Sequence, residues 1–368
     1  MKFSCSRTEL SEALGNVTRA VATKTTHPAM EGVLLVAEED ELVLSCYNME
    51  MGIKTYLNIH VIEDGAIVLN AKLFSDMVRK LPSETVVIES DEEKFITKIK
   101  GGAAEYNIMG IDPTEFPALP TVDEKIHFTI PQNVLKSMID QTIFAVAANE
   151  FKPVHTGSKF ILKDHLISIV SVDGFRLAIR TEPCSYHDEM DFIVPGKTLA
   201  EVAKLLDGEE EILVALTQKH IIFRIDEYDV ISRLLEGDFI DFRSSIPATA
   251  TTEVEVKVRD LLNAIDRTSL LINDRLKSPI KLSIGGDEIK IACSTALGKV
   301  NDTVECKTAG DSVEMGFNNR YLSEALRATE CDKVKIAINS PLSPVKIMPM
   351  EGESFLFLVL PVRMRTEM

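Results

Sequence analysis

One helical pattern occurs three times along this chain, and this limits the possible folds more than any other feature of the sequence. Each repeat has apolar residues at intervals of three and four, the spacing of a helix with one buried face. The second repeat follows the first by 125 residues, and the third follows the second by 126. A large apolar residue stands seven positions before each stripe: Phe3, Phe128 and Val254. The stripes are Leu10, Ala13, Leu14, Val17, Val21; Leu135, Met138, Ile139, Thr142, Val146; and Leu261, Ala264, Ile265, Thr268, Ile272. Three copies of one domain are therefore expected.

The length of the chain agrees with this repeat. A chain of 368 residues is too long for one ordinary core and suits three domains of about 120 residues. Short linkers rich in Pro and Thr near 119–123 and 247–252 predict domains at 1–120, 121–247 and 248–368.

The composition indicates a soluble, reduced protein. The chain has no apolar run of about 18 residues and no apolar signal sequence at its start, so we expect a cytoplasmic protein. Its six Cys residues form no CxxC pair, which predicts buried free thiols and no zinc site.

Each repeat is expected to be an α+β domain with two helices and about eight mostly antiparallel strands. In the first repeat, strands are predicted near 32–36, 41–45, 66–69, 85–88 and 94–97. Ser6 begins a capping box before the first helix, and Pro131 opens the corresponding helix of the second repeat. The second helix carries another apolar stripe, at Phe74, Met77, Val78, Leu81; Leu199, Val202, Ala203, Leu206; and Leu322, Ala325, Leu326, Thr329.

Basic residues recur at fixed positions of the repeat, although the chain as a whole is acidic. A net charge of −17, from 57 acidic and 40 basic residues, argues against nucleic-acid binding unless the two signs occupy different faces. The second helix has two positions opposite its apolar stripe, seven residues apart, and both are basic in every repeat. They are Lys72, Arg79, Lys197, Lys204, Arg320 and Arg327. A solvated surface explains any one of these charges, but the uniform sign favours a surface that attracts phosphate. An acid between them in each repeat, at Asp76, Glu201 and Glu324, weakens that attraction.

Motifs for catalysis are missing from the sequence. Pro195-Gly196-Lys197-Thr198 imitates the end of a P-loop, but Asp191 stands where the loop requires Gly. The acidic segment His187-Asp188-Glu189 with Asp191 is typical of solvated surface, and the seven His form no HExxH motif and no triad. We therefore expect no enzyme activity, no metal and no cofactor.

Two segments lack a counterpart in the other repeats. Asp173-Gly174-Phe175-Arg176-Leu177 follows an apolar strand, and the equivalent turns beginning at Asn48 and Thr295 are unlike it. The segment 355–364 is almost entirely apolar, and Pro361 ends its strand so that Val362 and Met364 reach the surface. Both segments are candidates for binding a partner.

In order and spacing, these residues resemble the bacterial sliding clamps, the β subunits of DNA polymerase III. The resemblance covers essentially the whole chain, at Met1-Lys2-Phe3, Pro28, Leu34-Leu35, Ala71-Lys72 to Leu81-Pro82, Phe116-Pro117, Asp173-Gly174, Arg176-Leu177-Ala178 and Leu360-Pro361-Val362-Arg363. It implies the DNA clamp fold: two chains join head to tail into a ring of six similar domains, with helices lining the hole. It also implies a non-catalytic processivity factor that encircles double-stranded DNA without regard to sequence. The implied partners are a second copy of the chain, the DNA polymerase III alpha subunit, the clamp loader, and replication and repair proteins that bind through short linear motifs.

The resemblance also implies three sets of site residues. Lys24, Asn149, Lys152, Pro153 and Lys197 are expected to lie near DNA. The dimer contact comprises Lys72, Phe74, Tyr106 and Ile108 on one chain, with Leu270, Leu271, Asn273 and Arg275 on the other. The groove for partner peptides comprises His155, Val172, Gly174, Phe175, Arg176, Leu177, Ile240, Pro344, Leu358, Val359, Leu360, Pro361, Val362, Arg363 and Met364. Phe175, Ile240 and Ser244 depart from common family choices, which leaves the preferred peptide open.

Two other interpretations remain open from the sequence. One is a repeat-built scaffold that binds only proteins, with the basic positions serving as ordinary surface. The other is an enzyme that uses Lys197 on a nucleotide, which the missing glycines disfavour.

Overall fold

The computed structural model describes residues 1–123, 125–148, 152–272 and 278–364. By its internal contacts the chain divides into two compact units, Met1–Asn133 with Glu201–Leu234, and Val134–Ala200 with Leu235–Met368. None of the helices in these ranges is both long and apolar enough to cross a membrane.

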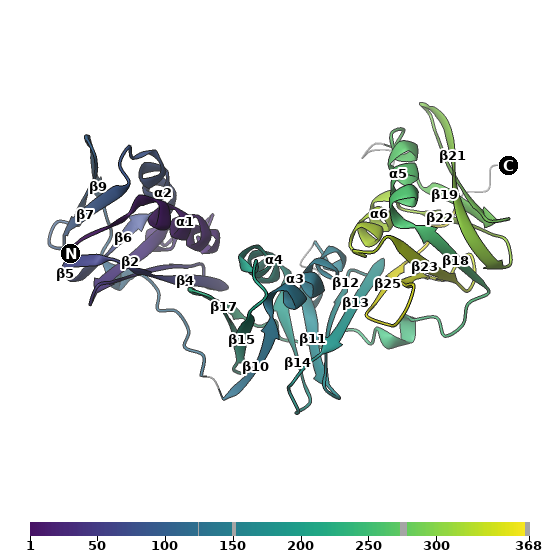
Figure 1. Ribbon diagram of the computed structural model, residues 1–368, viewed down its shortest axis with the longest axis horizontal. Helices are drawn as coiled ribbons and strands as arrows, with labels where there is room; N and C mark the ends of the chain where they lie inside the picture. The colour runs from purple at the N-terminus through teal and green to yellow at the C-terminus, as the bar shows by residue number, and fades with distance from the viewer. Residues whose placement is uncertain (124, 149–151, 273–277, 365–368) are drawn as a thin grey trace. The chain divides into compact units, whose positions relative to one another are not determined.

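Each repeat contains two α-helices, as predicted (Figure 1). Ser6 caps the first helix by accepting a hydrogen bond from the backbone N–H of Glu9 at 3.4 Å, which confirms this half of the capping box. Pro131 is the last residue of the preceding strand, and the helix begins one residue later. The helices are α1 (Arg7–Val17), α2 (Ala71–Lys80), α3 (Gln132–Asp140), α4 (Gly196–Leu205), α5 (Val258–Ser269) and α6 (Asn319–Arg327).

Antiparallel strands surround these helices, nine in the described part of the first repeat and eight in that of each of the others. The first repeat has β1 (Lys2–Ser6), β2 (Gly32–Glu38), β3 (Glu41–Tyr47), β4 (Met51–Asn58), β5 (His60–Glu63), β6 (Gly65–Asn70), β7 (Thr85–Asp91), β8 (Ile96–Gly101) and β9 (Ala104–Met109). The second has β10 (Ile126–Pro131), β11 (Gly157–Lys163), β12 (Leu166–Val172), β13 (Arg176–Pro183), β14 (Met190–Pro195), β15 (Glu211–Leu216), β16 (His220–Ile225) and β17 (Tyr228–Arg233). The third has β18 (Thr252–Lys257), β19 (Ile280–Gly285), β20 (Glu288–Thr295), β21 (Gly298–Gly310), β22 (Val313–Phe317), β23 (Lys333–Ile338), β24 (Val345–Pro349) and β25 (Phe355–Val359).

One predicted strand was wrong at its start. The strand predicted at 94–97 begins at Ile96, because Lys94 and Phe95 belong to a turn in which Phe95 has a φ of 52°. Asp91 builds this turn by accepting hydrogen bonds from the backbone N–H groups of Glu93 and Lys94 at 3.0 and 3.1 Å.

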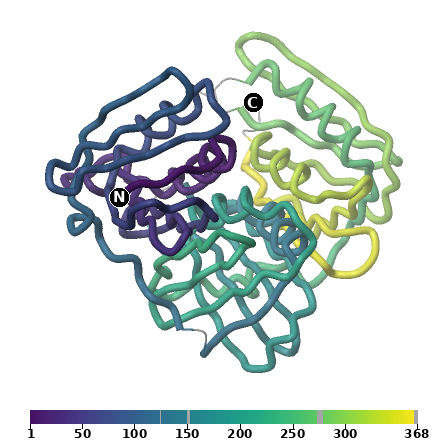
Figure 2. Tube along the Cα trace, turned by 60° about the vertical axis from the view of Figure 1, so that its left-hand side comes forward, coloured from purple at the N-terminus to yellow at the C-terminus, as the bar shows by residue number. Residues whose placement is uncertain are grey.

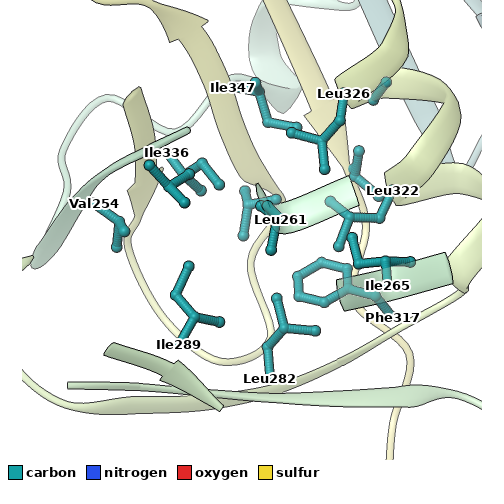
Figure 3. Close-up of a cluster of buried hydrophobic side chains, with 14 of the residues drawn as sticks. Val254, Leu261, Ile265, Leu282, Ile289, Phe317, Leu322, Leu326, Ile336 and Ile347 are labelled. Carbon is teal, nitrogen blue, oxygen red and sulfur yellow. The ribbon is translucent and has the colours of Figure 1, made fainter. Parts of the chain in front are cut away.

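The predicted helical stripes form the cores, except at the last position of each first-helix stripe. Val21, Val146 and Ile272 lie beyond the ends of α1, α3 and α5 and are only partly buried, so their assignment to the helices is wrong. In the third repeat, Leu261 and Ile265 of α5 and Leu322 and Leu326 of α6 point into one cluster of buried side chains (Figure 3). The sheets supply the other side of this cluster through Val254, Leu282, Ile289, Phe317, Ile336 and Ile347. Burial of one such side chain contributes about 1.5–3 kcal/mol, so the periodicity of the sequence accounts for the position of both helices.

Neighbouring repeats share continuous sheets. We call such a strand pairing between two repeats a joint. At the first joint, β17 pairs with β4, and Val230 lies opposite Ile53. At the second joint, β25 pairs with β13, and Phe357 lies opposite Ala178. The path of the chain between these strands can be followed in Figure 2.

The cysteines are all free. Cys5, Cys46 and Cys293 are buried as predicted, whereas Cys184, Cys306 and Cys331 are only partly buried. Burial, aided by Glu9, raises the pKa of Cys5 to about 12, so this thiol is a poor nucleophile at neutral pH.

Candidate functional site

The six predicted basic positions are all exposed, on α2, α4 and α6. The opposite faces of these helices are buried through Phe74, Leu199 and Leu322 together with their stripe neighbours. The two rows that the sequence predicts therefore face solvent in every repeat.

The acid between each pair of basic residues forms an ion pair on its own helix. Asp76 lies 3.7 Å from Arg79, and Glu201 lies 2.8 Å from Lys204. Glu324 instead forms an ion pair with Arg320, the first basic residue of its helix, at 2.7 Å. These pairs confirm the predicted weakening of the positive field. Within the described ranges, neither Lys72 nor Lys197 forms an ion pair with a carboxylate, so no adjacent acid offsets the field of these two residues.

The same acid also contacts the preceding repeat, which the sequence did not indicate. At the first joint, Arg19 Nε lies 3.9 Å from Glu201. At the second joint, Arg176 donates a hydrogen bond to Glu324 through its Nη1. The acid therefore contacts a neighbouring repeat in addition to weakening the field of its own helix.

The remaining predicted DNA contacts follow the first helix of a repeat. Lys24 and Lys152 are exposed. Asn149 lies outside the described residues.

The predicted peptide groove has a buried floor at the second joint. Leu177 lies opposite Leu358 across the strand pair, and both side chains are buried with Val172. Phe242 completes this cluster, with Phe239 and Ile246 packed against it. Val359 is fully buried as well, and its role in the groove stays a prediction.

Exposed apolar side chains surround this floor. Phe175 is 55% exposed, and Ile240, Leu360, Val362 and Met364 are each more than a third exposed. The backbone N–H of Leu360 donates to the carbonyl of Phe175 at 2.9 Å, which fixes the C-terminal segment beside the 173–177 turn. Such a group of exposed apolar side chains is a candidate binding surface.

The specialised turn is built around Asp173 and Arg176. Asp173 Oδ1 accepts hydrogen bonds from the backbone N–H groups of Phe175 and Arg176 at 2.9 and 3.0 Å. Gly174 has a φ of 89°, a conformation that favours glycine. The Arg176 guanidinium lies 4.6 Å above the Tyr321 ring, which stacks on Phe175 at 5.7 Å. The turn thus presents Phe175 while its arginine is buried.

The other predicted groove residues lie around this centre. His155 packs edge-on to Phe239 at 5.6 Å; burial and then Lys152 lower the pKa of His155. Pro344 is half-buried, and Pro361 and Arg363 are partly exposed. Val362 donates through its backbone N–H to the carbonyl of Gly316 at 2.9 Å. Val362 and Met364 thus lie beside β22.

Sequence reasoning missed Tyr321, Phe242 and the pocket beside Ile240. Tyr321 comes from a helix more than 140 residues beyond the turn, so no local pattern could join them. The pocket, of about 780 Å³, is lined by Lys159, Lys163, Glu189, Asp191, Ile240 and Arg243 among others. Two of its acids, Glu189 and Asp191, are the predicted solvated ones, and they pair with Lys163 and Lys159 at 2.9 and 3.2 Å. No arrangement of three or more metal-ligating side chains occurs within the described ranges.

Strand edges lie at the positions predicted for the subunit contact. Among the described strands, β9 ends its sheet and pairs with β8 alone. The segment Gly298–Glu305 of β21 pairs with β20, and its other edge has no partner strand among the described residues. Tyr106, Ile108 and Leu271 are half-buried, Lys72 is exposed, and Leu270 is 83% exposed.

One residue predicted for the subunit contact is buried within its own repeat. Phe74 is fully buried in the core and cannot reach a second chain, whereas its neighbour Leu73 is 46% exposed. Both fit an apolar contact by residue type, and only the rotation of α2 separates them. Asn273 and Arg275 lie outside the described residues.

Comparison with known proteins gives a single family across the chain. Models of the DNA polymerase III beta subunit match as its N-terminal domain at residues 1–120, its central domain at 129–241 and its C-terminal domain at 243–363. The beta sliding clamp of Halalkalibacterium halodurans is 32% identical over 379 residues, covering 99% of this chain and all of the relative.

Solved structures agree with these matches. The DNA polymerase sliding clamp of Bacillus subtilis has a TM-score of 0.96 at 31% identity, covering 99% of this chain and 100% of that one. The sliding clamp of Pseudomonas aeruginosa bound to griselimycin has a TM-score of 0.93 at 25% identity, with the same coverage. The predicted three-domain clamp fold is thereby confirmed, and the chain belongs to the family of DNA polymerase III beta subunits, the beta sliding clamps.

Proposed function

We propose that two copies of this chain join head to tail into a ring around duplex DNA. The ring tethers the replicative polymerase and other proteins and catalyses no reaction itself. One observation carries this proposal: three equivalent repeats form two joints, and among the described residues the edges of β9 and β21 that are equivalent to the joint-forming edges have no partner strand. A second chain in head-to-tail orientation pairs both edges.

The register of the two joints predicts that of the third. In the second repeat, Phe128 lies opposite Val214, Val214 opposite Phe223, and Phe223 opposite Val230. Val230 in turn lies opposite Ile53 of the first repeat. In the third repeat, the equivalent Val254 lies opposite Ile336, Ile336 opposite Ile347, and Ile347 opposite Phe357. Phe357 in turn lies opposite Ala178 of the second repeat.

In the first repeat, Phe3 lies opposite Ile88, Ile88 opposite Ile99, and Ile99 opposite Tyr106. Ile53 stands five residues after Asn48, the first residue of its turn, and Ala178 stands five residues after Asp173. The equivalent residue of the third repeat is Val300, five residues after Thr295. We therefore place Tyr106 opposite Val300 of a second chain.

Exposed side chains support the same contact. Leu73, Thr198 and Tyr321 occupy equivalent positions on the second helices. Thr198 is 2% exposed and Tyr321 is half-buried under Phe175, whereas Leu73 is 46% exposed. Leu73 therefore lacks a cover that both of its equivalents have.

The position after the first helix shows the same contrast. Arg19 contacts Glu201 of the second repeat, and Phe144 packs edge-on to Phe357 of the third at 5.3 Å. Their equivalent, Leu270, is 83% exposed. We propose that Leu270 packs against Leu73 of the second chain, because this contact removes both apolar side chains from water.

The basic rows on α2, α4 and α6 support the DNA-facing role of Lys72, Arg79, Lys197, Lys204, Arg320 and Arg327, with Lys24 and Lys152. The ion pairs within the helices leave the attraction weak, which suits a ring that must slide. Neutralising a residue that binds one phosphate should reduce the salt slope of DNA affinity by about 0.9.

The apolar surface around Phe175, Leu177 and Leu360 supports the binding of short apolar peptides from the polymerase alpha subunit, the clamp loader and repair proteins. We extend to this surface the binding of griselimycin that a relative shows. Domain limits at 1–120, 121–247 and 248–368 follow from the repeat, and we propose action on DNA in the cytoplasm.

Retention on DNA tests the ring. The protein is loaded by a clamp loader onto a nicked circular plasmid, and the bound fraction is measured by gel filtration before and after cutting with a restriction enzyme. A ring stays on the circle and slides off the linear product. Equal retention on both forms would contradict encirclement and favour the scaffold that binds only proteins.

A further inference from the structure

The second helices carry the same basic–acidic–basic trio, but α6 pairs its charges differently. In α2 and α4 the acid pairs with the second basic residue, Arg79 or Lys204. In α6, Glu324 Oε1 accepts from the first, Arg320 Nε, at 2.7 Å. The second basic residue of α6, Arg327, turns to Asp266 at 3.0 Å.

The other oxygen of Glu324 accepts a hydrogen bond from Arg176 at the peptide groove. Arg176 is 7% exposed, and its Nε donates to Asp173 Oδ2 at 3.0 Å. Burial disfavours the charged form of Glu324, but the hydrogen bonds from Arg320 and Arg176 prevail and hold the pKa of Glu324 below its ordinary value. One carboxylate thus holds an exposed arginine of α6 and a buried arginine of the groove.

The groove depends on where Arg176 lies. Its guanidinium contacts the Tyr321 ring at 4.6 Å, and Tyr321 stacks on the exposed Phe175 at 5.7 Å. A guanidinium with firm hydrogen bonds fixes the aromatic rings beside it, so the strength of the Glu324–Arg176 contact sets how well Phe175 is ordered for a ligand.

We propose that Glu324 is a positioning residue that couples DNA contact at Arg320 to ligand affinity at the Phe175 groove. The inference rests on the proposed function, which gives both surfaces their ligands. When a phosphate attracts Arg320, Glu324 loses one of its two cations, and its charge acts on Arg176 alone. Arg176 is then held more firmly, and the groove binds more tightly. By linkage, an occupied groove favours DNA contact at Arg320 by the same factor.

Calorimetric titration of the full chain with griselimycin, without DNA, tests this coupling. Arg320→Ala reproduces the withdrawal of Arg320 and is expected to tighten binding about two- to fivefold, the range of a partly exposed ion pair. Glu324→Gln is expected to weaken binding about tenfold, and in that background Arg320→Ala should have no further effect. Arg259→Ala, an exposed arginine on α5, serves as the matched control and should leave affinity unchanged.

The outcomes separate the coupling from the groove itself. A gain of affinity in Arg320→Ala cannot come from partial unfolding, so it supports the coupling even where Glu324→Gln lowers the melting temperature. Unchanged or weaker binding by Arg320→Ala would overturn the coupling while the groove stands. A wild-type chain that does not bind griselimycin would overturn the groove assignment and this proposal together.

Discussion

The first and second joints have one backbone pattern and two different surfaces. Val230 and Phe357 pair with Ile53 and Ala178 at equivalent positions, so the register belongs to the repeat. The turns beside the joints differ: the first has Glu50 where the second has Phe175, and Met51 where the second has Arg176. Strand pairing thus builds the scaffold, and a few turn residues distinguish the joint where we propose a binding surface.

The largest expected difference between the two joints is how much their arginine contacts contribute to the free energy of unfolding. Arg176→Ala leaves Asp173 and Glu324 without their shared cation and should lower the free energy of unfolding by about 3 kcal/mol. Arg19→Ala, at the first joint, removes a longer contact from a side chain that is 30% exposed and should cost less than about 1 kcal/mol. Urea denaturation of both variants measures the two changes. Equal decreases in the free energy of unfolding would contradict this difference between the joints.

Exchanging one turn residue should remove binding without disturbing the fold. Phe175→Glu places the residue of the first joint in the second and should weaken griselimycin binding about tenfold or more, because it removes the exposed ring. Phe175 is 55% exposed, so stability should change by only about 0.5 kcal/mol. Glu50→Phe is the reciprocal control and should create no second binding site. Unchanged affinity in Phe175→Glu would show that the groove lies elsewhere.

A smaller effect is expected at Asp140, whose equivalent at the first joint is Gly15. Asp140 is exposed at its surface, but desolvation by the surrounding protein and then Glu330 raise its pKa, whereas Lys136 lowers it. The folded state therefore holds this proton more tightly than the unfolded state, and stability rises as pH falls through the raised pKa. Asp140→Asn should stabilise the protein at neutral pH by less than about 0.5 kcal/mol and reduce this rise, as urea denaturation at several pH values would show. A decrease in stability at neutral pH would contradict this sign.

Local patterns in the sequence predicted much of this molecule. The spacing of Leu10, Leu135 and Leu261 with their neighbours revealed the repeat, because a helix must bury one face. The sign of Lys72 and its equivalents could be read because it recurs at a fixed spacing. Arg176 contacts Glu324, 148 residues away, and Leu73 differs from Phe74 only by a rotation of α2. Both depend on packing between distant segments, which a single sequence does not contain.

The register of the third joint is the central claim, and disulfide trapping tests it most directly. Cys293 lies opposite Val300 across β20 and β21, so it is first replaced by Ser in every variant. Tyr106→Cys with Val300→Cys should then form intersubunit bonds, because opposed residues of antiparallel strands lie close enough for a disulfide. Asn107→Cys with Val300→Cys is the control, since a one-residue shift turns the side chain to the other face. After oxidation, mass spectrometry should give a species of about twice 40.8 kDa for the first pair and not for the control. A first pair that remains monomeric, or a control that links equally well, would contradict the account.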